Sequence, residues 1–223
     1  MEISLKILFV LANLLSCFVT SGQVGVLFCV EKFLSLKFQK NEHMFKKMNF
    51  LTPTALNVLH FLLSNPMKQF HEREIVRQTE VSVGAVNQIL KKLHKAGLVE
   101  RDRRGRANFY RANLKNPVAR QFKVLFNVSA LDDLVDQIKQ ASERVVLFGS
   151  CAEGTDVEES DIDLFVLSSD VEVVRSKISE YERMFDRRIS PIVVDSRGFA
   201  KIKSKDKSLY ERISRGIRLW ERE

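Results

Sequence analysis

One stretch of the chain, residues 145–167, restricts the fold more than any other part of the sequence. It holds two apolar runs: the first ends at Gly149-Ser150, and the second opens with Asp161-Ile162-Asp163 after ten intervening residues. Short apolar runs bounded by turn residues are typical of buried β-strands. Because side chains alternate along a strand, Asp161 and Asp163 are predicted to lie on the same face. The stretch therefore predicts two strands of a buried sheet, joined by a loop over residues 149–160, with two carboxylates side by side.

This arrangement suits the binding of a nucleoside triphosphate. A Gly-Ser turn after a buried strand lets backbone N–H groups and the Ser150 hydroxyl approach a phosphate closely. Two carboxylates on one face suit Mg²⁺, which prefers oxygen ligands and is usually shared with substrate phosphates. The sequence therefore predicts an NTP site with Mg²⁺ as the cofactor. The alternative is a solvent-exposed turn followed by an edge strand with two exposed aspartates.

The same residues resemble the signature of the DNA polymerase beta-like nucleotidyltransferase superfamily, which is Gly-[Gly/Ser], a spacer, then [Asp/Glu]-hydrophobic-[Asp/Glu]. The resemblance implies that Gly149 and Ser150 bind the triphosphate, and that Asp161 and Asp163 are the catalytic, metal-binding carboxylates. The segment from Ser129 to the end is about 95 residues long. It resembles the minimal nucleotidyltransferases, which include antitoxin partners of HEPN ribonucleases.

Two departures from the family pattern bear on catalysis. Active members carry a third carboxylate on the next strand, which is predicted over Ile189–Val194, and the equivalent position there is Ser190. Asp186 and Asp195 flank this strand and could substitute only in a different register. Minimal members often carry a basic residue shortly after the Gly-Ser, where this chain has Glu153, and a negative charge beside a triphosphate is repulsive. Nucleotide binding is therefore better supported than nucleotide transfer.

The rest of the C-terminal half alternates between helical and strand patterns. A helix is predicted from the cap Ser169 to about Phe185, a final helix over residues 205–215 and a short edge strand over 216–220. Upstream, residues 116–142 predict a helical linker. Its first helix begins at Pro117, and its second begins at the S-x-x-D box from Ser129 to Asp132. We expect residues 143–223 to form a small mixed-sheet domain.

Residues 44–115 predict a helix-turn-helix followed by a hairpin. One helix opens at Thr52-Pro53, a second covers residues 72–78, and a third runs from the cap Ser82 to Gly97. An apolar stripe on the third helix leaves polar side chains of groove-reading types toward solvent, namely Ser82, Asn87, Gln88 and Lys91. Two short strands then flank an Arg/Gly turn over residues 102–106, the predicted wing, whose phosphate contacts are Arg103, Arg104 and Arg106.

The charge of the chain is unevenly distributed. Residues 44–115 hold 14 Lys and Arg against 5 Asp and Glu, a net +9, whereas residues 116–223 hold 18 against 20, a net −2. Such asymmetry is typical of a nucleic-acid-binding module joined to a neutral or acidic one. The basic segment also resembles the winged helix-turn-helix of archaeal and bacterial regulators, which implies binding to duplex DNA. The alternative is a winged helix that serves protein interaction or dimerisation.

The N-terminal 43 residues contain an uncharged run of 24 residues, from Ile7 to Val30. That length could cross a bilayer core, and the lysines that follow would keep the downstream domains in the cytoplasm. The alternative is that translation begins at Met44 or Met48, directly before the first well-patterned helix, so that residues 1–43 are upstream sequence.

Cysteine and histidine usage narrows the function classes. The three cysteines and four histidines are scattered without metal-ligand spacing, which argues against a disulfide scaffold, a zinc ribbon or a histidine-based zinc hydrolase. The sequence therefore predicts an α+β protein in which a winged helix-turn-helix, a helical linker and a nucleotidyltransferase fold follow one another. Two functions stay open: transfer of a nucleoside monophosphate from an NTP to a hydroxyl, or transcriptional regulation with a nucleotide-binding sensor domain. A homodimer and a HEPN-type toxin are the further partners that we expect.

Overall fold

The computed structural model describes residues 51–185 and 187–222. The N-terminal segment 1–43, with its apolar run 7–30, lies outside these residues, as does Asp186. None of the helices that are described is long and apolar enough to cross a membrane.

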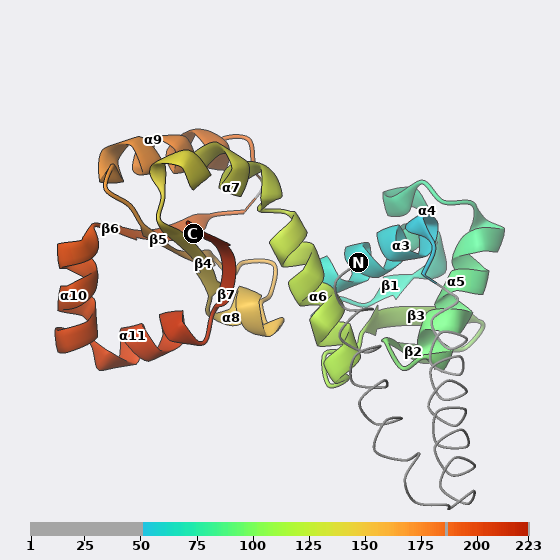
Figure 1. The fold of residues 1–223 in the computed structure, drawn as a ribbon. Coiled ribbons are helices and arrows are strands. Elements are labelled where there is room, and N and C mark those ends of the chain that lie inside the picture. The colour runs from blue at the N-terminus through green and yellow to red at the C-terminus, as the bar shows by residue number, and fades with distance from the viewer. Residues whose placement is uncertain (1–50, 186, 223) are drawn as a thin grey trace, which may run out of the picture. The chain divides into compact units, whose positions relative to one another are not determined.

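The predicted winged helix forms, and its elements follow the expected order (Figure 1). They are α3 (Pro53–Ser64), β1 (Phe70–His71), α4 (Glu72–Thr79), α5 (Val83–Lys95), β2 (Val99–Arg104) and β3 (Ala107–Ala112). The strands pair antiparallel in the order β1-β3-β2. The helices bury one apolar core against this sheet, with Leu62, Leu90 and Tyr110 among its members.

The helix starts have the caps that the sequence predicts. The side chains of Thr52 and Ser82 accept hydrogen bonds from the backbone N–H groups of Ala55 and Ala85. The hairpin differs from the prediction, because β2 continues through Arg104 and the turn shrinks to Gly105 and Arg106. Strand β1 was not predicted, since two residues are too few to show a periodic pattern.

Two helices connect the winged helix to the second sheet. Helix α6 (Pro117–Ser129) begins at the predicted proline, with Asn116 as its cap. Helix α7 (Asp132–Ile138) follows, then the short 3₁₀ turn η1 (Lys139–Ala141). The predicted capping box at Ser129 is wrong: Ser129 is the last residue of α6, and the cap position of α7 is the buried Leu131, without a side-chain hydrogen bond.

These two helices pack on different cores. Ala119, Phe122 and Phe126 of α6 join the core of the winged helix, whereas Leu134 and Ile138 of α7 join the core beneath the second sheet. The predicted linker is thus an integral part of both packed regions.

The second sheet is mixed and four-stranded, as predicted, with the order β6-β5-β4-β7. Its strands are β4 (Arg144–Phe148), β5 (Ile162–Leu167), β6 (Ile189–Val194) and β7 (Ile217–Glu221). Strands β5 and β6 run parallel, while β4 pairs antiparallel with both β5 and β7. Strand β7 is the predicted edge strand. The α+β fold class is therefore confirmed.

Helices cover both faces of this sheet. Helix α9 (Val171–Glu182) lies with α7 over one face, and α10 (Ser196–Lys205) with α11 (Lys207–Ser214) over the other (Figure 1). Ser169 does not cap α9, since Asp170 occupies the cap position, and the helix ends three residues earlier than predicted. The predicted final helix corresponds to α11, and α10 was missed. Asp206 separates the two helices because its carboxylate caps the start of α11.

Candidate functional site

The predicted nucleotide loop, residues 149–160, begins with Gly149, a position where any other residue would strain the backbone. Gly149 has φ +71°, in the left-handed region that favours glycine. A Cβ atom at this position would lie 2.1 Å from Oδ2 of Asp163. The carboxylate of Asp163 therefore packs directly against the Gly149 backbone, so the structure brings the two halves of the sequence motif into contact.

Ser150 opens the short helix α8 (Ser150–Glu153), which was predicted as part of a loop. The carbonyl of Gly149 accepts hydrogen bonds from the N–H groups of Ala152 and Glu153, and this closes the turn. The acidic side chain of Glu153 is exposed at the end of α8. Ser150 is half-buried beside Gly149.

The two predicted carboxylates differ in their surroundings. Asp163 is half-buried on β5, whereas Asp161 precedes the strand and is exposed. Burial raises the pKa of Asp163, the Arg212 guanidinium opposes this shift, and the negative charge of Asp161 adds to it. The fold therefore disfavours the charged form of Asp163 and gives this carboxylate Arg212 as a cationic partner.

Arg212 is the residue of this site that sequence reasoning missed. It comes from α11, and its Nη2 lies 3.4 Å from Oδ2 of Asp163. Its guanidinium also lies 5.3 Å from the ring centroid of Phe148, which pairs with Asp163 across β4 and β5. Forty-nine residues separate Arg212 from Asp163, so no local pattern could have joined them.

The third strand has no carboxylate next to the pair. In the parallel register of β5 and β6, Ser190 stands opposite Asp163, as the sequence predicted. Asp195 follows Val194, which pairs with Leu167 at the other end of β5, and its carboxylate caps α10 by accepting from the Gly198 N–H at 2.7 Å. Asp195 therefore cannot complete the site at Asp163.

The donor set fits one divalent ion better than two. Among the described residues, no group of three or more His, Cys, Asp or Glu side chains could hold a metal ion. Mg²⁺ in nucleotide sites is commonly bound by one or two carboxylates together with substrate phosphates. Asp161 and Asp163 match that requirement, whereas a second ion would need a further carboxylate.

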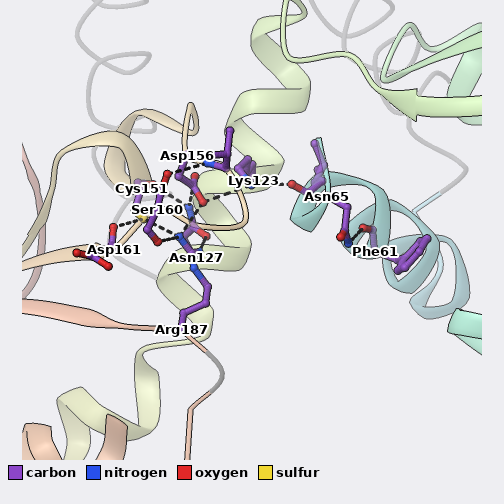
Figure 2. Close-up of polar contacts among 11 residues, drawn as sticks. Phe61, Asn65, Lys123, Asn127, Cys151, Asp156, Ser160, Asp161 and Arg187 are labelled. Atoms are coloured by element: carbon purple, nitrogen blue, oxygen red, sulfur yellow. Dashed lines mark hydrogen bonds and ion pairs between the residues drawn. The ribbon is translucent and has the colours of Figure 1, made fainter. Parts of the chain in front are cut away.

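A buried polar network supports the nucleotide loop from behind, with α6 as its base (Figure 2). The amide nitrogen of Asn127 donates to the Cys151 carbonyl and to Oδ1 of Asp156, both at 3.0 Å. Arg187 donates to Oδ1 of Asn127 and to the Ser160 carbonyl. The two ends of the loop are thus fixed to the same helix.

Cys151 completes this network. Its Sγ lies 3.6 Å from the Asp161 carbonyl as donor and 3.3 Å from Nη2 of Arg187 as acceptor. Burial raises the pKa of the Cys151 thiol. The thiol therefore serves as a small buried link beneath Asp161.

Lys123 extends the network to the winged helix. Its Nζ donates to the Leu63 carbonyl near the end of α3 at 2.6 Å and lies 3.3 Å from Oδ2 of Asp156. The side chains of Lys123 and Asp156 are 4% and 1% exposed. Burial lowers the pKa of Lys123, and the Asp156 charge opposes this shift. One buried ion pair thus connects the last turn of α3 with the nucleotide loop.

Most of the predicted groove-reading residues lie on the surface of α5. Ser82, Gln88 and Lys91 are exposed. Asn87 differs from the prediction, because it is half-buried and its amide donates to Oε2 of Glu72 at 3.1 Å. Glu72 also accepts from the Tyr110 hydroxyl. Asn87 therefore ties α5 to α4 rather than facing solvent.

The predicted wing arginines are all exposed. Arg103 donates to the Gly105 carbonyl within the turn. Arg104 pairs with Asp102 at 2.9 Å and lies 4.9 Å from the centroid of the Phe109 ring. Arg106 is exposed at the tip. The wing therefore exposes three arginines, of which Arg104 is already paired with Asp102.

Comparisons with known proteins agree with this architecture. The MarR family model matches residues 51–107, and the nucleotidyltransferase domain model matches residues 129–218. Putative protein adenylyltransferase MJ0141 of Methanocaldococcus jannaschii is 36% identical over 67 residues, which cover 27% of this chain and 68% of the relative. Putative protein adenylyltransferase MJ1305 of the same organism is 34% identical over 87 residues, covering 34% of this chain and 58% of the relative.

Solved structures of two other proteins are similar to part of the chain. The transcriptional repressor BigR from Xylella fastidiosa has a TM-score of 0.34 and 19% identity, covering 46% of this chain and 96% of that one. Rv0081 from M. tuberculosis has a TM-score of 0.34 and 19% identity, covering 45% and 95%.

The fold and the family matches define a two-domain protein, with a MarR-type winged helix DNA-binding domain before a nucleotidyltransferase domain. By its C-terminal domain the chain belongs to the nucleotidyltransferase family that includes the putative protein adenylyltransferases of M. jannaschii.

Proposed function

We propose that this protein is a DNA-binding regulator whose nucleotidyltransferase domain binds an NTP with Mg²⁺ and uses it as a signal. The observation that carries the proposal is the register of β5 and β6, which places Ser190 opposite Asp163. The site keeps the two carboxylates needed to bind a metal-nucleotide complex. Among the described residues, which do not include Asp186, it has no third carboxylate to activate an attacking hydroxyl.

Each residue of the site has a separate role in this proposal. Gly149 lets the backbone approach the phosphates closely, and the hydroxyl of Ser150 donates to them. Asp161 and Asp163 would hold Mg²⁺, which neutralises the triphosphate. Arg212 adds a positive charge beside Asp163.

The buried network supports the regulatory part of the proposal. Lys123 and Asn127 lie one turn apart on α6 and contact the carbonyl of Leu63 and the nucleotide loop, respectively. A change in the position of the loop would therefore act on α6 and, through it, on the end of α3. Coupling of this kind is reciprocal, so DNA would alter nucleotide affinity by the same factor.

The test of nucleotide binding uses the full chain with labelled ATP and Mg²⁺, and scores binding and transfer separately. We expect Mg²⁺-dependent binding without transfer. Replacing Asp161 and Asp163 together by Asn should abolish binding and leave folding intact, because Asp161 is exposed and Asp163 is only half-buried. Unchanged binding in this variant would mean that the motif is an ordinary turn and strand.

The test of DNA binding uses the wing. Replacing Arg103, Arg104 and Arg106 by Ala should flatten the salt dependence of duplex binding, by up to about 0.9 in the log-log slope for each phosphate that the wing no longer neutralises. A salt-independent or absent interaction would overturn this part.

Transfer of a nucleoside monophosphate is the second candidate function, favoured by the relatives' name, putative protein adenylyltransferase. If β6 is the strand of the third carboxylate, Ser190→Asp should introduce transfer that Ser190→Asn does not. Transfer by the unmodified chain would instead favour the enzyme and would direct attention to Asp186. The homodimer, the HEPN-type toxin partner and the membrane anchor remain predictions from the sequence.

A further inference from the structure

Two helices on opposite faces of the C-terminal sheet have very different charges. Helix α9 carries Arg175 and Lys177 together with Glu172, Glu180 and Glu182. Helix α10 carries four basic residues and no acidic one: Arg197, Lys201, Lys203 and Lys205. The domain that is slightly acidic as a whole therefore concentrates positive charge on one of its helices.

The charges of α10 form a row on its outer face. Arg197, Lys201 and Lys205 follow one another at intervals of four residues, which places them on one side of the helix about 6 Å apart along its axis. All three are exposed, while Phe199 and Ile202 on the other side pack against the sheet core that contains Phe165.

The row has no internal compensation. Within the part of the chain that the structure describes, Arg197, Lys201 and Lys205 have no acidic partner within 4.0 Å, and neither have the neighbouring Lys203 and Lys207. Like charges four residues apart destabilise a helix. An uncompensated row of this kind therefore points to an external polyanion that offsets the repulsion.

We propose that the outer face of α10 is a second phosphate-binding surface for nucleic acid, separate from the winged helix. Flexible lysine ammonium groups at one-turn intervals suit a repeating backbone charge. No large apolar side chain of α10 or α11 is exposed, so the face lacks the groups that an amphipathic helix inserts into a membrane.

The winged helix favours nucleic acid over an acidic protein as the occupant. DNA held by the basic N-terminal domain is present at high effective concentration around the rest of the same chain. Contacts from α10 would then add to binding without reading sequence, because phosphate contacts carry no sequence information by themselves.

The test measures binding of the full chain to a duplex of arbitrary sequence over a range of salt concentrations. Replacing Arg197, Lys201 and Lys205 by Gln should weaken binding and lower the slope of log affinity against log salt by about 2 to 3. The matched control removes the same charge at α9, through Arg175→Gln and Lys177→Gln within the helix and Arg183→Gln directly after its last residue, and should leave the slope unchanged.

A single substitution separates recognition from folding. Lys201→Glu places one acidic charge between Arg197 and Lys205, so it should raise the melting temperature slightly while weakening binding to the duplex. An equal weakening in the α9 control, or an unchanged slope in the α10 variant, would overturn the proposal. The proposal would also be overturned if the α10 substitutions weakened binding to vesicles of phosphatidylcholine and phosphatidylserine, or to a polyglutamate peptide, but left binding to the duplex unchanged.

Discussion

Two carboxylates of the C-terminal domain pair with cations, but one pair is buried and the other is partly exposed. Asp156 is 1% exposed and lies between Lys123 and Arg187, at 3.3 and 3.1 Å. The Asp163 side chain is 29% exposed and has Arg212 at 3.4 Å, with the arginine itself 55% exposed. Removing one partner of a buried ion pair costs much free energy because the remaining charge is not solvated. An exposed pair costs little to break because water solvates both charges. The comparison teaches that the Asp156 group fixes the loop, whereas Asp163 has a partly exposed partner, as our proposal of a ligand site at Asp163 requires.

The largest expected effect comes from removing the buried carboxylate. Asp156→Ala leaves Lys123 and Arg187 without their counter-charge and should lower the free energy of unfolding by about 3–5 kcal/mol. Glu158→Ala is the matched control, since Glu158 pairs with Lys68 on the surface and its removal should cost no more than about 1 kcal/mol. Denaturant unfolding of both variants checks this, and equal destabilisation would erase the contrast between buried and exposed pairs.

A glycine substitution tests the exposed group. Gly149→Ala should cost about 1–3 kcal/mol, because φ +71° with ψ −156° is a backbone conformation that essentially only glycine adopts. It should also abolish nucleotide binding, because the new Cβ would displace the Asp163 carboxylate. Gly105→Ala has a similar φ of +61° but no atom within 4 Å of the added Cβ, so it should show the strain alone. Nucleotide binding that survives in Gly149→Ala would contradict the contact between Gly149 and Asp163.

The smallest effect concerns pH at the rim of the buried network. Although His60 is exposed, its ring packs against Phe126, and this partial desolvation together with the nearby Lys123 charge lowers its pKa from 6.5. As the pH falls below 6.5, the unfolded chain takes up a proton that the folded protein resists, so stability that is present at neutral pH is lost. His60→Gln should lose less stability than the unmodified protein between about pH 8 and about pH 5. If the melting temperatures of the unmodified protein and of His60→Gln changed equally across this range, His60 would contribute nothing to the pH dependence of stability.

Sequence patterns predicted the elements whose signals are local. The strand Ile189–Val194 and the position of Ser190 followed from one apolar run, and the register of β6 with β5 agrees. The start of α6 followed from Pro117, because proline at the first helical position is a local signal.

The parts that were missed depend on distant residues. Arg212 reaches Asp163 only because α11 crosses the sheet face, and Lys123 meets Asp156 only because α6 packs beside α8. Asn87 has the composition of a groove-reading residue, but Glu72 from the preceding helix engages it. Side-chain partners of this kind are fixed by tertiary packing, which a single sequence does not display.

The most direct test of the account is the affinity of the full chain for duplex DNA, measured with and without ATP and Mg²⁺, for the unmodified protein and for the variant with Asn at both Asp161 and Asp163. The account predicts that the nucleotide changes the DNA affinity of the unmodified protein, by about 5-fold or more for a typical coupling energy, and leaves that of the variant unchanged. A DNA affinity that is indifferent to nucleotide, in a protein shown to bind both ligands, would contradict the claim that the two domains act as one regulator.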